Sequence, residues 1–244
     1  MNKLHLVISV QLLAVAGSLL AAETIYQDPV PAGANRAAVA VPRNDWYRDV
    51  QNKFDKYSGK PADIVFEGDS ITNRWEGTGK AVWKEHFEGR AADFGIEGDR
   101  VENALWRLSK GQVDDINPKV VVIMLGTNNT YFNSAEQIAE GLKLLVAEYQ
   151  KRCPQAHIIL MGVFPRGKDA NDGGRKKVAE INKIISRYAD GDKVSFVDIS
   201  DKMIQPDGTI STDMMPDFVH PTAKGYEIWG DAILPINNKY APKK

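Results

Sequence analysis

Short apolar runs alternate with longer amphipathic segments along most of this chain, and that alternation limits the possible folds more than any other feature. Five runs have the length and composition of buried strands, namely residues 64–66, 91–96, 120–125, 158–163 and 194–197. Helical patterns lie between and after them, at residues 44–57, 99–108, 134–146, 175–189 and 221–237. Strands that alternate with helices of this length form right-handed β-α-β units. We therefore expect an α/β fold, a three-layer α/β/α sandwich around a five-stranded parallel sheet.

Side chains that can cap a helix stand at the start of three of these segments. Asn44 and Asp99 come shortly before apolar helical faces and are the expected N-caps of their helices. Ser134 is followed three residues later by Gln137, which is the spacing of a capping box. The sequence thus predicts where these three helices begin.

The 244 residues fit one large domain better than two small ones, because a single core stops growing only near about 250–300 residues. A net charge of −1 without a basic run argues against a nucleic-acid partner. Cys153 is the only cysteine, so no internal disulfide can form, and we expect a buried or half-buried thiol without a catalytic role. Residues 23–43, rich in proline and alanine, are interpreted as a linker or extended arm, and residues 44–244 as the folded domain.

The first 22 residues have the pattern of a secretory signal peptide. Lys3 precedes an apolar stretch that runs to Leu20, and the small Ala21 and Ala22 follow. The alternative is an uncleaved anchor helix, but the stretch is short for a membrane span of about 20 residues. We expect an exported protein, periplasmic or secreted, without stable membrane insertion after cleavage. N-terminal sequencing of protein from its host should find a start near residue 23 or 19, whereas an intact residue 1–22 segment indicates an anchor.

Several polar residues and glycines come directly after predicted strands. Ligands of open parallel sheets bind beyond the carboxyl ends of the strands, where Ser70, Gly98 and Asn128 are expected. Ser70 opens a helix, whose first N–H groups can stabilise negative charge. Backbone at a glycine can approach a substrate closely, and an asparagine amide can donate to a developing oxyanion. Taken singly, Ser70 is equally explained as a helix cap, and Asn128 as part of an ordinary turn.

Among the histidines beyond the signal segment, His220 has the most suggestive neighbour. Asp217 precedes it by three residues, so a carboxylate can orient the imidazole while the other ring nitrogen faces a nucleophile. His157 stands at the start of a predicted strand and is expected to serve packing or solvation, and His86 is interpreted as a helix-surface or half-buried residue. A surface Asp and His can share this spacing by chance, but a nucleophile, two donors and an acid–base pair converge on one sheet edge. No ligand cluster with metal spacing accompanies them, so neither a metal nor an organic cofactor is expected.

Four sequence blocks carry a resemblance to a known family. They are residues 66–70 (FEGDS), 94–99 (FGIEGD), 126–129 (GTNN) and 217–220 (DFVH). In this order they resemble the blocks of the SGNH (GDSL-like) hydrolases. Residues 105–108, 118–120 and 165–167 add a likeness to the catalytic subunits of platelet-activating-factor acetylhydrolase type Ib. The resemblance runs over about residues 60–235, nearly the whole expected domain.

The resemblance implies a role for each matching residue. Ser70 is implied as the nucleophile, His220 as the general base and Asp217 as its orienting carboxylate. The implied oxyanion hole consists of the backbone N–H groups of Ser70 and Gly98 and the side-chain amide of Asn128. It further implies a serine esterase without cofactor that cleaves small acyl esters, acetyl above all, on glycans or short-chain lipids. Its oligomeric state is left open.

Two positions depart from the family pattern, and one rival interpretation stays open. Ile71 follows the nucleophile where the family name has leucine, and Glu97 adds a carboxylate beside the implied oxyanion glycine. Trp75 and Trp83 follow the nucleophile and either line the mouth of the site or pack in the core. The rival from another class is a non-catalytic glycan- or surface-binding module built on a hydrolase fold.

Overall fold

Five parallel strands form a single sheet in the computed structural model, which describes residues 30–43, 46–57 and 59–243. They are β1 (Ile64–Gly68), β2 (Ala91–Asp93), β3 (Val120–Met124), β4 (His157–Met161) and β5 (Val194–Val197). Their order across the sheet is β2-β1-β3-β4-β5, and each neighbouring pair is parallel. The expected five-stranded parallel sheet is confirmed.

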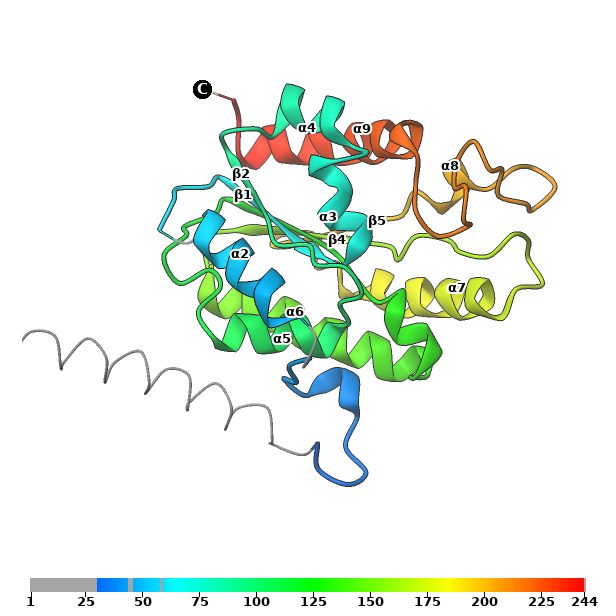
Figure 1. Ribbon diagram of the computed structural model, residues 1–244, viewed down its shortest axis with the longest axis horizontal. Helices are drawn as coiled ribbons and strands as arrows, with labels where there is room; N and C mark the ends of the chain where they lie inside the picture. Colours follow the sequence, from blue (N-terminus) through cyan, green and yellow to red (C-terminus); the bar gives the residue numbers. More distant parts are fainter. Residues whose placement is uncertain (1–29, 44–45, 58, 244) are drawn as a thin grey trace, which may run out of the picture.

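Helices cover both faces of this sheet and complete the three layers (Figure 1). The lower layer in Figure 1 holds α2 (Tyr47–Tyr57), α5 (Val101–Ser109), α6 (Ala135–Arg152) and α7 (Gly173–Ile185). The opposite core is closed by α3 (Ser70–Asn73), α4 (Lys80–His86), α8 (Ser200–Met203) and α9 (Ala223–Tyr240). Short 3₁₀ turns are η1 (Arg36–Ala38), η2 (Arg74–Glu76), η3 (Asn128–Tyr131) and η4 (Ser186–Tyr188).

Side chains of the central strands alternate between the two cores. In β1 and β3, Val65 and Val121 pack with the α5–α6–α7 layer, while Phe66 and Val122 pack against the aromatic cluster of the other layer. A strand between two helical layers is buried on both faces, so its sequence is a nearly continuous apolar run. This burial explains why the strands could be recognised in the sequence.

The predicted helix starts have three different outcomes. The Ser134 capping box is confirmed: its hydroxyl accepts from the Gln137 N–H at 3.2 Å, and the Gln137 side chain accepts from the Ser134 N–H at 3.0 Å. The prediction for Asp99 is wrong, because α5 has Arg100 as its N-cap and the Asp99 carboxylate is bound in the interior. Asn44 lies outside the described residues.

The predicted signal peptide, residues 1–22, also lies outside the described residues and stays a prediction. The described part of the arm, residues 30–43, lies against α5 and α6. Ala37 is buried there, the Val41 N–H donates to the Glu102 carbonyl at 3.0 Å, and Asn103 donates back to the Val41 carbonyl at 2.8 Å. Within the ranges that the structure describes, no helix is both long and apolar enough to span a bilayer.

The two tryptophans that follow Ser70 belong to the core. Trp75 is fully buried and its ring lies 4.7 Å from that of Trp229, while Trp83 packs on Phe66. Of the two uses considered for them, packing is confirmed and lining the mouth of the site is wrong. Cys153 is buried at the end of α6, as expected, and burial raises the pKa of its thiol to about 11.

Candidate active site

Ser70 stands where β1 ends and α3 begins, at the carboxyl edge of the sheet. The preceding Asp69 is the N-cap of α3 and accepts from the Ile71 N–H at 3.0 Å. Gly68 allows the sharp exit from the strand, because a Cβ at this position would lie 2.5 Å from the carbonyl oxygen of Met124 on β3. The Ser70 side chain is thereby fixed at the end of the strand with only 5% of its surface exposed.

Asp217 and His220 lie in a tight turn that precedes α9. Asp217 Oδ1 accepts from the backbone N–H groups of Val219, at 3.0 Å, and His220, at 2.8 Å, so the carboxylate organises its own turn. Phe218 within this turn has a φ of 60°, a left-handed conformation that is uncommon for residues other than glycine. Such conformations cluster at functional sites.

The structure brings Ser70, His220 and Asp217 into direct contact. Ser70 Oγ lies 2.8 Å from His220 Nε2, and His220 Nδ1 lies 2.6 Å from Asp217 Oδ2. Burial opposes ionisation of Asp217, but hydrogen bonds from His220 and the Val219 N–H outweigh it and lower the carboxyl pKa to about 2. An ionised carboxylate accepts a hydrogen bond from Nδ1, which leaves Nε2 to accept from the serine hydroxyl.

A second serine–histidine contact shows what sets the first apart. His157 Nε2 lies 2.8 Å from Ser195 Oγ, but its Nδ1 lies against the Asp192 backbone carbonyl at 3.1 Å rather than a carboxylate. The His157 ring also stacks on Tyr240, and burial lowers its pKa. A serine–histidine distance therefore does not define a relay, whereas the carboxylate and the place at the carboxyl edge distinguish Ser70 and His220.

Gly98 and Asn128 line a shared cavity of about 310 Å³. Gly98 has a φ of 75°, where a side chain is strained, and a Cβ would lie 2.8 Å from Arg43 Nη1. Asn128 Nδ2 donates to the backbone carbonyl of Asp99 at 2.9 Å. Because an amide NH₂ carries two protons, this bond orients the group and leaves one proton for another acceptor.

A buried set of polar side chains holds the loop between β2 and α5; we call it the Arg107 network. It consists of Glu67, Asp99, Arg107, Gln112 and Tyr149. Arg107 Nη2 lies 2.6 Å from Glu67 Oε1 and 2.9 Å from Asp99 Oδ2. Burial raises the pKa of Asp99 to about 6, against the attraction of Arg107. Since Asp99 adjoins Gly98, the network ties that glycine to strand β1.

The Asp69 carboxyl gives a pH-dependent prediction. It is fully buried, and burial raises its pKa to about 7 despite the Ile71 N–H bond. An unfolded aspartate titrates near about 3.9, so folding takes up a proton between these values and stability falls as pH rises through 7. Asp69→Asn keeps the hydrogen-bond acceptor and removes the charge. The melting temperature of this variant should therefore rise relative to that of the wild type between pH 5 and pH 8.

Thermal unfolding followed by circular dichroism at both pH values measures this gain. The same substitution at the exposed Asp49 controls for a general effect of removing one negative charge. A difference between Asp69→Asn and wild type that does not change with pH contradicts the prediction.

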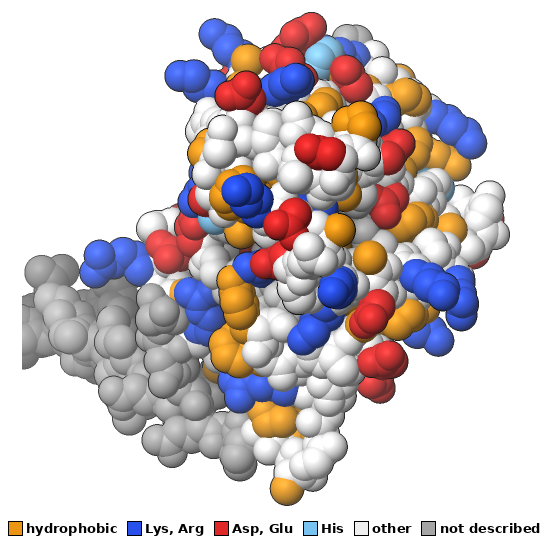
Figure 2. All heavy atoms as spheres, turned by 90° about the vertical axis from the view of Figure 1, so that its right-hand side faces the viewer, with side chains coloured by type: hydrophobic (Ala, Val, Ile, Leu, Met, Phe, Trp, Pro, Cys, Tyr) orange, Lys and Arg blue, Asp and Glu red, His pale blue; other side chains and the backbone are white. Residues whose placement is uncertain are grey.

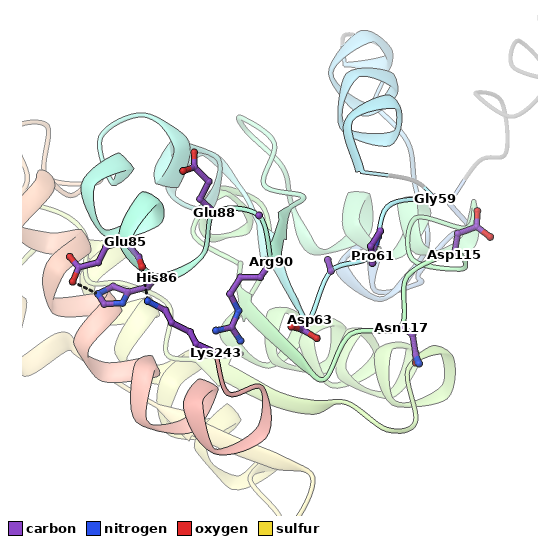
Figure 3. Close-up of a pocket in the computed structure, with 12 residues that line it drawn as sticks. Gly59, Pro61, Asp63, Glu85, His86, Glu88, Arg90, Asp115, Asn117 and Lys243 are labelled. Atoms are coloured by element: carbon purple, nitrogen blue, oxygen red, sulfur yellow. Dashed lines mark hydrogen bonds and ion pairs between the residues drawn. The ribbon is translucent and has the colours of Figure 1, made fainter.

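A larger cavity, of about 680 Å³, lies at the amino ends of the strands, opposite the carboxyl edge that carries Ser70 (Figure 3). Its lining includes Asp63, Arg90 and Asn117, which precede strands β1, β2 and β3. Arg90 binds the Ala241 carbonyl, and Lys243 donates to the Glu85 carbonyl at 2.7 Å. No nucleophile with a base lines this cavity, so volume alone does not identify the site. In the described ranges, no three His, Cys, Asp or Glu side chains are placed to hold a metal ion.

Some residues around the site lie outside the sequence motifs and were not predicted. Arg43, Arg100, Tyr131 and Phe132 line the cavity of Gly98 and Asn128, yet none belongs to the predicted site. The available signal was the pair of adjacent aromatic residues, Tyr131 and Phe132, which stand one residue after the 126–129 block and outside any apolar periodicity.

A serine hydroxyl, an imidazole and a carboxylate in line at the carboxyl edge of a parallel sheet form the constellation of the serine hydrolases. The model of the GDSL-like Lipase/Acylhydrolase family matches residues 66–228, and the chain belongs to this family. The resemblance noted in the sequence is thus confirmed, and the chain is an ester hydrolase of the SGNH type.

A relative in sequence agrees with this assignment, and two solved structures share the fold. The rat platelet-activating factor acetylhydrolase IB subunit alpha2 is 36% identical over 205 residues, which cover 82% of this chain and 86% of the relative. A putative acylhydrolase from Bacteroides fragilis shares the fold with a TM-score of 0.64 and 23% identity, over 80% of this chain and 96% of that one. A catalytic mutant of an acetylxylan esterase from Geobacillus stearothermophilus has a TM-score of 0.57 and 20% identity, over 73% and 94%.

Proposed function

We propose that this ester hydrolase is an exported serine esterase that removes small acyl groups, above all acetyl, from glycan or short-chain lipid esters. In this proposal Ser70 is the nucleophile, His220 the general base and Asp217 the carboxylate that orients it. The observation that carries the proposal is the pair of contacts from Ser70 Oγ to His220 Nε2 and from His220 Nδ1 to Asp217 Oδ2.

The proposed reaction has two acyl-transfer steps. His220 Nε2 takes the hydroxyl proton as Ser70 Oγ attacks the ester carbonyl, and the carbonyl oxygen becomes an oxyanion. The backbone N–H groups of Ser70 and Gly98 and the Asn128 amide stabilise that charge. The imidazolium then gives its proton to the departing alcohol, which leaves an acyl-serine. Water attacks the acyl-serine by the same route and releases the carboxylic acid.

The choice of a small acyl group is supported by two relatives and by the enclosure of the nucleophile. The similar rat protein is named an acetylhydrolase, and the structural neighbour from Geobacillus stearothermophilus is an acetylxylan esterase. The Ser70 side chain is nearly buried, so the attacked carbonyl must enter a confined space. The pattern of residues 1–22 supports export.

Two measurements on the purified full chain test the proposal. Hydrolysis of 4-nitrophenyl acetate, butyrate and octanoate should fall steeply with acyl length. A fluorophosphonate should label one serine, and peptide mapping should place the label on Ser70. A label on any other serine, or no hydrolysis of any ester, contradicts the proposed mechanism.

A further inference from the structure

Two loops extend beyond the carboxyl ends of the strands, at the right of Figure 1. The β4–α7 loop consists of residues 162–172 and includes the 165–167 segment noted in the sequence, while the α8–α9 loop consists of residues 204–222. Asp217 and His220 lie in the α8–α9 loop. In Figure 2, which faces this end of the molecule, positive and negative side chains are mixed over the surface. The contacts that join the two loops lie beneath this surface.

Hydrogen bonds connect the α8–α9 loop to the β4–α7 loop and to the start of α7. They run from the Gly167 N–H to the Phe218 carbonyl at 2.9 Å, from the Ile210 N–H to the Lys168 carbonyl at 2.9 Å, and from Arg175 Nη1 to the Gly208 carbonyl at 3.2 Å. Within the described ranges, the contact between His220 and Ser70 is the only other hydrogen bond that joins this loop to a distant segment. The orientation of the Asp217–His220 turn therefore depends on the neighbouring loop.

Apolar packing also holds the α8–α9 loop, but it does not set the direction of the turn. Ile210 and Met215 are buried in the core beneath it. Hydrophobic contacts are non-directional, whereas a hydrogen bond has a preferred angle. Phe218, with its φ of 60°, lies between Asp217 and His220, and such a conformation persists only where the surroundings enforce it. The bond from the Gly167 N–H to the Phe218 carbonyl supplies such a constraint.

Arg175 holds the Gly167 peptide from the other side. Its Nε donates to the Arg166 carbonyl at 2.8 Å, and its Nη2 donates to the Gly167 carbonyl at 2.6 Å. Gly167 has a φ of 78°, and a Cβ there would lie 2.2 Å from Asp172 Cγ, so only glycine fits. The Asp172 side chain in turn caps α7 by accepting from the Arg175 N–H at 3.0 Å. Gly167 is thus bound through its carbonyl to Arg175 and through its N–H to Phe218.

The side chain of Arg175 is used to bind backbone rather than to form an ion pair. It is 7% exposed, its three bonding nitrogens all donate to carbonyls, and Asp172 and Asp169 attract its charge from a greater distance. A planar guanidinium can hold three carbonyls at once, which a lysine ammonium on its flexible stem does less well. The β4–α7 loop is itself fastened, because Arg166 Nη1 donates to the Thr127 carbonyl at 3.0 Å.

We propose that Arg175 is a positioning residue for the proposed acid–base pair, acting through the Gly167 peptide on the turn that carries Asp217 and His220. This inference rests on the proposed esterase function and adds to it a residue that touches no reacting atom. If the turn is free to shift, the ester still binds, but His220 Nε2 is less often in line with Ser70 Oγ. The loss should therefore fall on kcat rather than on KM.

The first measurement is the steady-state kinetics of Arg175→Met on 4-nitrophenyl acetate. We expect kcat per folded molecule to fall by about 10–100-fold and KM to change by less than about 2-fold, because a misplacement of about 1 Å can cost about 10²-fold in rate. Arg175→Lys keeps the charge and part of the donor set, so its kcat should lie between those of Arg175→Met and the wild type. It also provides a second variant in case Arg175→Met does not fold.

The matched control is Arg152→Met. Arg152 lies in the last turn of α6, where it pairs with Asp114 at 2.9 Å and with Glu148 at 3.5 Å. This variant loses a guanidinium and two ion pairs away from the site, so its kcat should equal that of the wild type. Circular dichroism and the melting temperature of each variant give the folded fraction.

A double-mutant cycle separates a positioning role from a purely structural one. Asp217→Asn weakens the pair on which Arg175 is proposed to act, so adding Arg175→Met to it should lower kcat by less than about 3-fold. A structural role that only reduces the folded fraction has the same effect in both backgrounds.

The remaining outcomes decide between the two proposals. A wild-type kcat per folded molecule in Arg175→Met, or an equal loss with and without Asp217→Asn, overturns the positioning role while the esterase function stands. A wild-type protein that does not hydrolyse 4-nitrophenyl acetate, or an Asp217→Asn variant with wild-type kcat, removes the proposed acid–base pair itself, and the role of Arg175 falls with it.

Discussion

Ser70→Ala should lower kcat/KM for 4-nitrophenyl acetate by about 10⁴–10⁶-fold, because the variant has no oxygen with which to form the acyl-enzyme. The remaining oxyanion donors and the binding surface can still favour direct attack by water, which accounts for any residual rate. Removal of one buried hydroxyl leaves the hydrophobic core untouched. Steady-state rates per folded molecule, with folding checked by circular dichroism, measure the loss.

The chain provides a matched control for this substitution. Ser195 makes the same 2.8 Å contact with His157 that Ser70 makes with His220, but it lies on β5 and its histidine has no carboxylate partner. Ser195→Ala should therefore retain wild-type activity. Activity that survives in Ser70→Ala, or is lost in Ser195→Ala, would assign the nucleophile to another residue.

Asn128→Ala should lower kcat by about 10²–10³-fold and change KM little, because the amide donates to charge that exists mainly in the transition state. The bond from Asn128 Nδ2 to the Asp99 carbonyl keeps the amide oriented before substrate arrives. Steady-state kinetics on 4-nitrophenyl acetate, together with the melting temperature, separates this role from that of an ordinary turn residue. A turn residue predicts a lower melting temperature with kcat per folded molecule unchanged.

The neighbouring Asn129 offers the opposite case. Its side chain accepts from the Val101 N–H at 3.0 Å and donates to Glu102 at 2.8 Å, so it caps α5 from inside the core. Asn129→Ala should lower the melting temperature, since it leaves buried polar groups unpaired, and reduce kcat far less than Asn128→Ala does. If the two variants behave alike, Asn128 has no special function in catalysis.

The sheet and the place of the site could be predicted from the sequence for a physical reason. Strands buried on both faces are mostly apolar, and parallel strands bring the residues that follow them to one edge. The expectation that Ser70, Gly98 and Asn128 share one edge of the sheet follows from this rule alone. Their roles came from the family resemblance, because each residue alone also suits a cap or a turn.

The interior polar contacts could not be predicted. An aspartate just before a helix usually caps it, but Asp99 turns inward because Arg107 and the Trp46 indole bind its carboxylate. Arg107 also meets Glu67, forty positions earlier in the chain, and a single sequence does not reveal which distant charges pair. The short helices α4 and α8 were likewise missed, since four to seven residues show too little periodicity.

The cavity around Arg100 could not be predicted because it is assembled from three separate segments. Arg43 comes from the arm, Arg100 from the loop before α5, and Tyr131 and Phe132 from η3 and the residue after it. Only the fold brings these segments to one place. Tyr131 and Phe132 are also exposed, so no core pattern marks them in the sequence.

Many enzymes need both a rigid catalytic site and a binding surface that can change, and the Arg107 network contributes only to the first. It fastens the segment that carries Gly98 to the interior, so the geometry of the proposed oxyanion hole is set when the protein folds. The side chains of Tyr131 and Phe132, by contrast, project from the surface and take no part in that network. Substitutions at Tyr131 and Phe132 should therefore change what this surface can bind without disturbing the Arg107 network. Such a division gives the scaffold evolutionary latitude, because new specificities can arise by small steps from a catalyst that already works.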